Sequence, residues 1–66
     1  MNIKCGQIWA DNQGGHLLVV YVPVDDPDTV WVCLSDQVGM PLDASAPIST
    51  THFTAWTLAG LAGPAA

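Results

Sequence analysis

Two cysteines and two histidines are the residues of this sequence best suited to nucleophilic or metal chemistry. Cys33 and His52 could form a thiolate–imidazole pair, because a fold can bring together a nucleophile and a base that are distant in sequence. With Cys5 and His16, they also supply side-chain types that zinc accepts as ligands. None of the four stands at the C-x2-C or H-x3-H spacing of a structural zinc site. We therefore expect ordinary histidines, no metal, no cofactor and no catalytic site.

Three aspartates, Asp25, Asp26 and Asp28, stand together in the segment DDPD. Their carboxylates could hold a divalent cation, but the segment lacks the D-x-[DN]-x-[DN]-G pattern and the terminal glutamate of a calcium loop. Pro27 fixes one backbone angle and aspartate is common in turns. The segment therefore predicts a solvated turn between two strands.

The charge balance excludes several classes of partner. The sequence has six acidic residues and a single base, for a net charge of -5, and all six acids are aspartate. Neutralising nucleic-acid phosphates requires several lysines or arginines, so direct nucleic-acid binding is excluded. Attraction to an anionic membrane surface is excluded for the same reason.

Length and composition predict one small domain inside a cell. A chain of 66 residues buries only about 60% of the surface that its unfolded form exposes, so it holds one core. No basic region followed by an apolar one marks a signal peptide, and the longest apolar run is far too short to span a bilayer. We therefore expect a cytoplasmic protein of a bacterial or phage-infected host cell, with Cys5 and Cys33 as free thiols in preference to the one disulfide that they could form.

The pattern of apolar and turn residues predicts an all-β fold without a helix. We expect strands near residues 7–10, 17–24 and 29–34, with a hairpin joining the last two across DDPD. A brief strand near 38–42 and one or two more in 48–58, with a turn at 51–53, would complete the fold. Residues 59–66 contain two glycines and a proline and are expected to form a flexible tail.

Two sequence motifs resemble those of SH3-like barrels, and of small uncharacterised bacterial and phage proteins in particular. The first is the opening K-x-G-Q-I-W-x-D, residues 4–11, and the second is I-x-x-x-x-F-x-x-W-x-L, residues 48–58. The resemblance implies a small antiparallel barrel of four to five strands over residues 1–58, followed by the tail at 59–66. Toxin nucleases of the PemK and MazF type also open with a G-x-I-W strand, but they are longer and use basic residues that this chain lacks.

The two central strands are apolar on both faces. Strict alternation places Leu18, Val20, Val22 and Val24 on one face, and the residues between them, including Tyr21, on the other. On the next strand it separates Val30, Val32 and Leu34 from Trp31 and Cys33. Because one small barrel has one interior, the outer face must be covered by the tail, by a second copy or by a partner, unless strongly bent strands feed the core from both sides.

These observations predict a non-enzymatic protein-interaction module, such as a small accessory protein of a phage or bacterium, that binds itself and a host or cellular protein. Aromatic side chains dominate the energetics of interfaces. The expected contact residues are aromatic, with an acidic rim: Trp9, Tyr21, Trp31, Trp56, Asp25, Asp26 and Asp28. The alternative is an acidic decoy that presents carboxylates to the nucleic-acid site of another protein.

Overall fold

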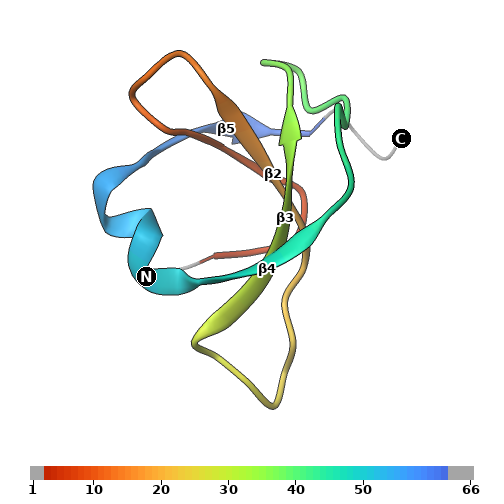
Figure 1. Ribbon diagram of the computed structural model, residues 1–66, viewed down its shortest axis with the longest axis vertical. Helices are drawn as coiled ribbons and strands as arrows, with labels where there is room; N and C mark the ends of the chain where they lie inside the picture. Colours follow the sequence, from red (N-terminus) through yellow and green to blue (C-terminus); the bar gives the residue numbers. More distant parts are fainter. Residues whose placement is uncertain (1–2, 63–66) are drawn as a thin grey trace.

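The described part of the chain forms one sheet of five antiparallel strands, which confirms the expected all-β fold (Figure 1). It also contains one short 3-10 helix, which was not expected. The computed structural model describes residues 3–62. The elements in chain order are β1 (Gln7–Ala10), β2 (His16–Tyr21), β3 (Thr29–Ser35), β4 (Ala46–Ser49), the 3-10 helix η1 (Thr50–Ala55) and β5 (Thr57–Leu61). The strand order across the sheet is β4-β3-β2-β1-β5. The first strand therefore lies between the second and the last.

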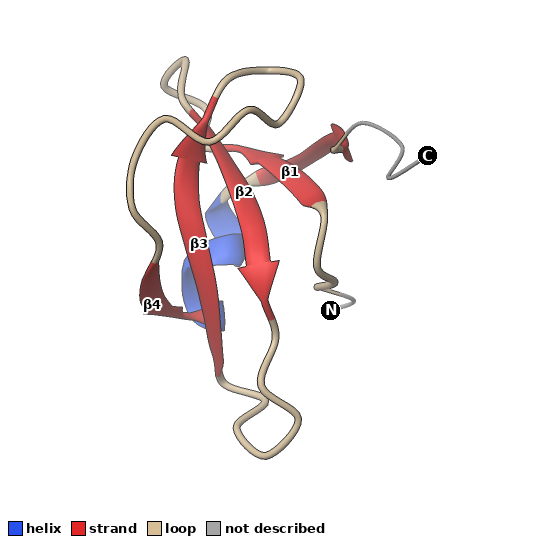
Figure 2. Cartoon of the chain, turned by 90° about the vertical axis from the view of Figure 1, so that its right-hand side faces the viewer, coloured by secondary structure: helices blue, strands red, loops and turns tan. Residues whose placement is uncertain are grey.

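The main core lies on the face of the sheet that η1 covers. Figure 2 shows η1 behind β2 and β3. Its Phe53 is 1% exposed and packs with Trp9, Val19, Val30 and Val32. Ser49 caps the start of η1 by accepting a hydrogen bond from Thr51 N. This core joins residues from both halves of the sequence.

A second, smaller cluster lies on the opposite face of the sheet. Ile8 pairs with Leu18 and Leu18 with Cys33 across β1, β2 and β3, and paired residues share a face. All three side chains are buried, with exposures of 2%, 8% and 4%. Gly39 and Ala62 lie against Ile8: a methyl group at Gly39 would come within 3.2 Å of Ile8 Cδ1 and 3.0 Å of Ala62 Cβ. Gly39, in the β3–β4 connection, and Ala62, directly after β5, thus cover this part of the outer face.

A β-bulge in β2 changes which residues face outward. Val19 pairs with Val32, but the next pair is Tyr21 with Trp31, so Val20 is the extra residue. Strict alternation put Tyr21 on the side of Val19, and that prediction is wrong. The bulge brings Tyr21 opposite Trp31, and Val22 instead packs against the main core.

Several element boundaries differ from those expected. β2 ends at Tyr21 and not at residue 24, because the chain leaves the sheet before Pro23, which has no N–H for a ladder. The segment 38–42 forms a single bridge between Ser35 and Pro41 instead of a strand. The expected turn at 51–53 belongs to η1. The tail was predicted to start at residue 59, but β5 continues through Leu61; residues 63–66 of that prediction lie outside the described residues.

Candidate functional site

The thiol and imidazole groups considered for catalysis lie in different parts of the fold. Cys33 is buried with Ile8 and Leu18 on the outer face, whereas His52 projects from η1 and stacks on Trp56 with ring centroids 6.0 Å apart. Trp56 itself packs against the main core, on the other side of the sheet. The structure therefore does not bring Cys33 and His52 together. Burial raises the pKa of the Cys33 thiol, and the charge of Asp43 acts in the same direction, so this sulfur is a poor nucleophile.

The ligand-type side chains do not converge either. Within residues 3–62, no three histidine, cysteine, aspartate or glutamate side chains lie close enough to hold a metal ion. Cys5 is exposed and its Sγ donates to Val20 O at 3.3 Å. In the same part of the chain, no helix is long and apolar enough to cross a membrane.

Three of the six aspartates stabilise turns through their carboxylates. Asp11 Oδ1 accepts from Gln13 N at 2.8 Å and from Gly15 N at 2.9 Å, between β1 and β2. Asp36 Oδ1 accepts from Val38 N and Met40 N, both at 2.9 Å, after β3. These backbone N–H groups lower the pKa of both carboxyls, with Gln13 the largest influence on Asp11 and Met40 on Asp36.

The third of these turn aspartates is Asp43, whose Oδ1 accepts from Ala44 N at 2.7 Å. The other three, Asp25, Asp26 and Asp28, form a second class. Their side chains make no hydrogen bond or ion pair within residues 3–62. All three are exposed on the β2–β3 connection, which extends away from the sheet in Figure 2. These three carboxylates can therefore interact with another molecule without first breaking a contact within residues 3–62.

An exposed aromatic row crosses the outer face next to the covered cluster. Tyr21 pairs with Trp31, and Trp31 pairs with Pro47 of the edge strand β4, so the three side chains share one face. Tyr21 is 57% exposed and Trp31 37%. Pro47 is also exposed. We call Tyr21, Trp31 and Pro47 the aromatic row.

The other two tryptophans do not belong to this surface. Trp9 was predicted as a contact residue with Tyr21 and Trp31, but it is buried in the main core at 8% exposure. Its indole N–H donates to Gln7 Oε1 at 3.1 Å, so even its polar atom is satisfied internally. Trp56 is half-buried, against Phe53 at 4.9 Å between ring centroids. Of the four aromatic contact residues predicted, the structure thus brings together Tyr21 and Trp31.

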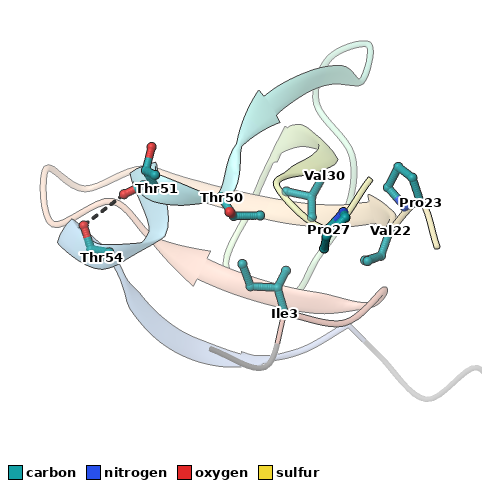
Figure 3. Close-up of a pocket in the computed structure, with 8 residues that line it drawn as sticks. All are labelled: Ile3, Val22, Pro23, Pro27, Val30, Thr50, Thr51 and Thr54. Carbon is teal, nitrogen blue, oxygen red and sulfur yellow. Dashed lines mark hydrogen bonds between the residues drawn. The ribbon is translucent and has the colours of Figure 1, made fainter. Parts of the chain in front are cut away.

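A groove opens on the η1 side of the sheet, at the end where the β2–β3 connection leaves it (Figure 3). Its volume is about 460 Å³. The apolar lining comes from three parts of the chain, and threonines of η1 supply the polar part; the lining residues are Ile3, Val22, Pro23, Pro27, Val30, Thr50, Thr51 and Thr54. Thr50 N donates to Asp28 O at 2.9 Å, which fastens the acidic connection to the start of η1.

A second hollow of about 460 Å³ lies at the opposite end of β2 and is lined by His16, Leu34, Ser35, Asp36 and neighbouring residues. Ser35 pairs with His16 across the strands, but its hydroxyl donates to Asp36 O at 3.0 Å. The Ser35 hydroxyl is thus directed to a backbone carbonyl and not to a base. This arrangement does not have the hydrogen bonding of an activated nucleophile.

Two features of these surfaces were not predicted from the sequence. Pro47 lies outside the predicted strands, although a proline on an edge strand is compatible with a sheet because its missing N–H can face away from the ladder. The groove was missed because its lining residues are spread over 52 positions, from Ile3 to Thr54. The one signal was the presence of two prolines, Pro23 and Pro27, near the aspartates. Comparisons with protein-family models, with curated proteins and with solved structures return no match for this chain.

Proposed function

We propose that this chain is a non-enzymatic protein-binding module that contacts its partners, a second copy of itself included, through the aromatic row. One observation carries the proposal: the chain covers one part of its apolar outer face and leaves the adjacent part open. Gly39 and Ala62 lie against Ile8, whereas Tyr21 and Trp31 remain 57% and 37% exposed. Large aromatic side chains held on a rigid sheet supply contact area at a low cost in conformational entropy.

The geometry of the row supports binding by a flat or ridged apolar surface. Its residues come from three neighbouring strands, so their relative positions are fixed by the ladder hydrogen bonds of the sheet. A side chain held in place before binding loses less freedom on association than one on a mobile loop. Burying the exposed parts of Tyr21 and Trp31 would contribute on the order of a few kcal/mol at about 25 cal/mol per Å² of apolar area.

The non-enzymatic part of the proposal is supported by the chemistry of the reactive groups. Cys33 is buried with a raised pKa, His52 stacks on Trp56, and Ser35 donates to a backbone carbonyl. None of these pairs a nucleophile with a base in the way that covalent catalysis needs.

The alternative function, an acidic decoy of nucleic acid, requires the carboxylates on one face. In the structure these aspartates instead lie in two groups, at opposite ends of β2. Asp11 and Asp36 both lie near His16, at the start of β2, whereas Asp25, Asp26 and Asp28 follow the end of that strand. Six residues of strand separate the two groups by roughly 20 Å at about 3.3 Å per residue. Binding through the aromatic row is therefore the function that the geometry supports better.

Sedimentation equilibrium tests self-association, and affinity capture from a native lysate tests for other partners. Trp31→Ala is expected to weaken self-association and to remove captured proteins. Leu61→Ala, which truncates a side chain that is 73% exposed outside the row, serves as the matched control and should change neither. A chain that is strictly monomeric at millimolar concentration and captures nothing in a Trp31-dependent way would contradict the proposal. Capture of nucleic-acid-binding proteins that weakens steeply with added salt would instead support the decoy.

A further inference from the structure

We propose that the groove between η1 and the β2–β3 connection is a second binding site, which accepts an extended segment of a partner protein carrying an apolar side chain next to lysine or arginine. This site is separate from the aromatic row. Val30 lines the groove and its neighbour Trp31 belongs to the row, and successive residues of a strand point to opposite faces. The two surfaces can therefore be tested independently.

The shape and lining of the groove fit an apolar side chain. A volume of about 460 Å³ lies within the range of roughly 300–1,000 Å³ that ligand sites occupy. In Figure 3 the side chains of Ile3, Val22, Pro27 and Val30 surround the same space. A leucine or similar side chain placed there would exchange water for contacts with these groups.

The rim of the groove is polar and held in place. Thr54 Oγ1 donates to Thr51 O at 2.9 Å, which orders the helix side (Figure 3). On the other side, the backbone bond from Thr50 to Asp28 fastens the connection, and Thr29 N donates to Asp26 O at 3.2 Å. The aspartates therefore project from a backbone that is hydrogen-bonded on both sides of Asp28, and binding would not have to order it first.

The charges beside the groove indicate the chemistry of its occupant. Pro27 lines the groove, and the exposed carboxylates of Asp26 and Asp28 stand on either side of it in the chain. Neither carboxylate, nor that of Asp25, has a hydrogen-bond or ion-pair partner within the described part of the chain. The whole sequence contains one lysine and no arginine, so a basic segment of another protein is the better source of cations for these three carboxylates.

The same charges disfavour other occupants. A second copy would bring a net charge of -5 to a site that is already acidic, and like charges brought together oppose association. A phosphorylated segment or a nucleic acid is disfavoured for the same reason. A basic segment gains from both the apolar lining and the carboxylates, and long-range attraction would speed its association.

The test uses a seven-residue synthetic peptide with one leucine flanked by two lysines in a glycine–serine background, titrated into the ¹⁵N-labelled full chain. We expect saturable shifts of the backbone amides of Val22, Val30 and Thr50–Thr54. Two control peptides separate the contributions: one replaces leucine with glycine, and the other replaces both lysines with glutamate. Both should bind at least about tenfold more weakly, since each removes one of the two complementary features.

Variants of the chain provide the second arm. The triple variant Asp25→Asn, Asp26→Asn and Asp28→Asn should weaken the lysine peptide about tenfold without unfolding, because these carboxylates accept no hydrogen bond from residues 3–62. Asp43→Asn, which removes a charge elsewhere, and Trp31→Ala should each change the affinity by less than about twofold. Replacing the same three aspartates with lysine should reverse the preference toward the glutamate peptide.

Four results would overturn the proposal. These are the absence of saturable binding, shifts centred on Tyr21 and Trp31 instead of the groove, equal affinity for the peptide without leucine, and unchanged affinity of the triple asparagine variant. Shifts at Tyr21 and Trp31 would leave the aromatic row supported while removing the groove. The failure of this site is thus distinguishable from the failure of the proposed function.

Discussion

Phe53 meets the indole of Trp9 edge-on, with ring centroids 5.0 Å apart and ring planes at 90°. The same phenyl ring contacts Trp56, at 4.9 Å and 64°. One side chain of η1 thus joins a strand from the start of the sequence to the segment that leads into the last strand. Edge-to-face aromatic pairs contribute about 0.5–1.5 kcal/mol beyond the burial of their area.

Phe53→Ala is therefore expected to lower the free energy of unfolding by about 3–5 kcal/mol, the usual cost of removing a buried phenyl ring. Phe53→Leu should have a smaller effect because it keeps most of the apolar volume. Urea unfolding followed by tryptophan fluorescence measures both. Val24→Ala, at a side chain that is 98% exposed, should stay within about 0.5 kcal/mol of the unchanged chain. Equal effects at Phe53 and Val24 would contradict the assignment of the core.

Two glycines should respond to alanine with opposite signs. Gly39 has φ of +91° and its added Cβ would lie 3.0 Å from Ala62 Cβ, so Gly39→Ala should destabilise the fold by about 1–3 kcal/mol. Gly60, in β5, does not have a positive φ of this kind, and no atom lies within 4 Å of the Cβ that alanine would add. Gly60→Ala should stabilise by up to about 1 kcal/mol through the unfolded chain. Thermal unfolding compares the two, and a stabilising Gly39→Ala would show that the connection does not lie against Ile8 as described.

Acid should weaken the fold through Asp11 and Asp36. Both carboxyls have a pKa below the ordinary value of 3.8 in the folded chain, because backbone N–H groups donate to them. A lowered pKa gives stability that is fully present above pH 3.8 and is lost as the pH falls through the folded-state value. The double variant Asp11→Asn, Asp36→Asn should have a lower free energy of unfolding at neutral pH. It should also lose less stability as the pH falls, so that the acid limb of its stability profile is flatter. Urea unfolding between pH 2 and 7, roughly the window of carboxyl titration, measures both effects.

Asp26→Asn is the matched control, since this exposed carboxylate accepts no hydrogen bond within residues 3–62. It should leave the acid limb in place. An unchanged acid limb in the double variant would show that the two turns do not depend on their carboxylates.

The two thiols should differ in reactivity. Cys5 is exposed, whereas Cys33 is 4% exposed and burial raises the pKa of its thiol. With iodoacetamide at neutral pH, Cys5 should react at least about a hundredfold faster, because Cys33 must wait for local opening. Intact-mass spectrometry follows the labelling. Cys5→Ser should leave a folded chain that resists modification until denaturant is added, and rapid labelling of that variant would contradict the burial of Cys33.

The central hairpin could be predicted from the sequence because its signals are local. Residues 29–34 are dense in β-branched and aromatic side chains, and β3 occupies Thr29–Ser35. The DDPD segment was correctly placed between two strands. The first strand was also predicted at its observed position, Gln7–Ala10. Covering of the apolar outer face by the end of the chain was one of the alternatives that the pattern left open.

The surface residues could not be predicted in the same way, because they depend on long-range pairing. The bulge at Val20 arises from the match between β2 and β3 and moves Tyr21 to the face of Trp31. Trp9 and Trp31 have the same residue type and similar neighbours, yet η1 covers only the face that carries Trp9. Nor could the sequence show that some aspartates serve turns while others have no partner within the described residues. That distinction requires the positions of backbone N–H groups.

The position of β1 between β2 and β5 has a consequence for how the chain folds. Gly6 O accepts from Ala62 N at 2.6 Å, across most of the sequence. Gln7 pairs with Leu61, so the first strand is synthesised more than 50 residues before its second neighbour. Closing so large a loop is slow, and small β proteins with contacts of this kind fold in times on the order of milliseconds to seconds. Until then one edge of β1 stays unpaired and open to strands of other chains.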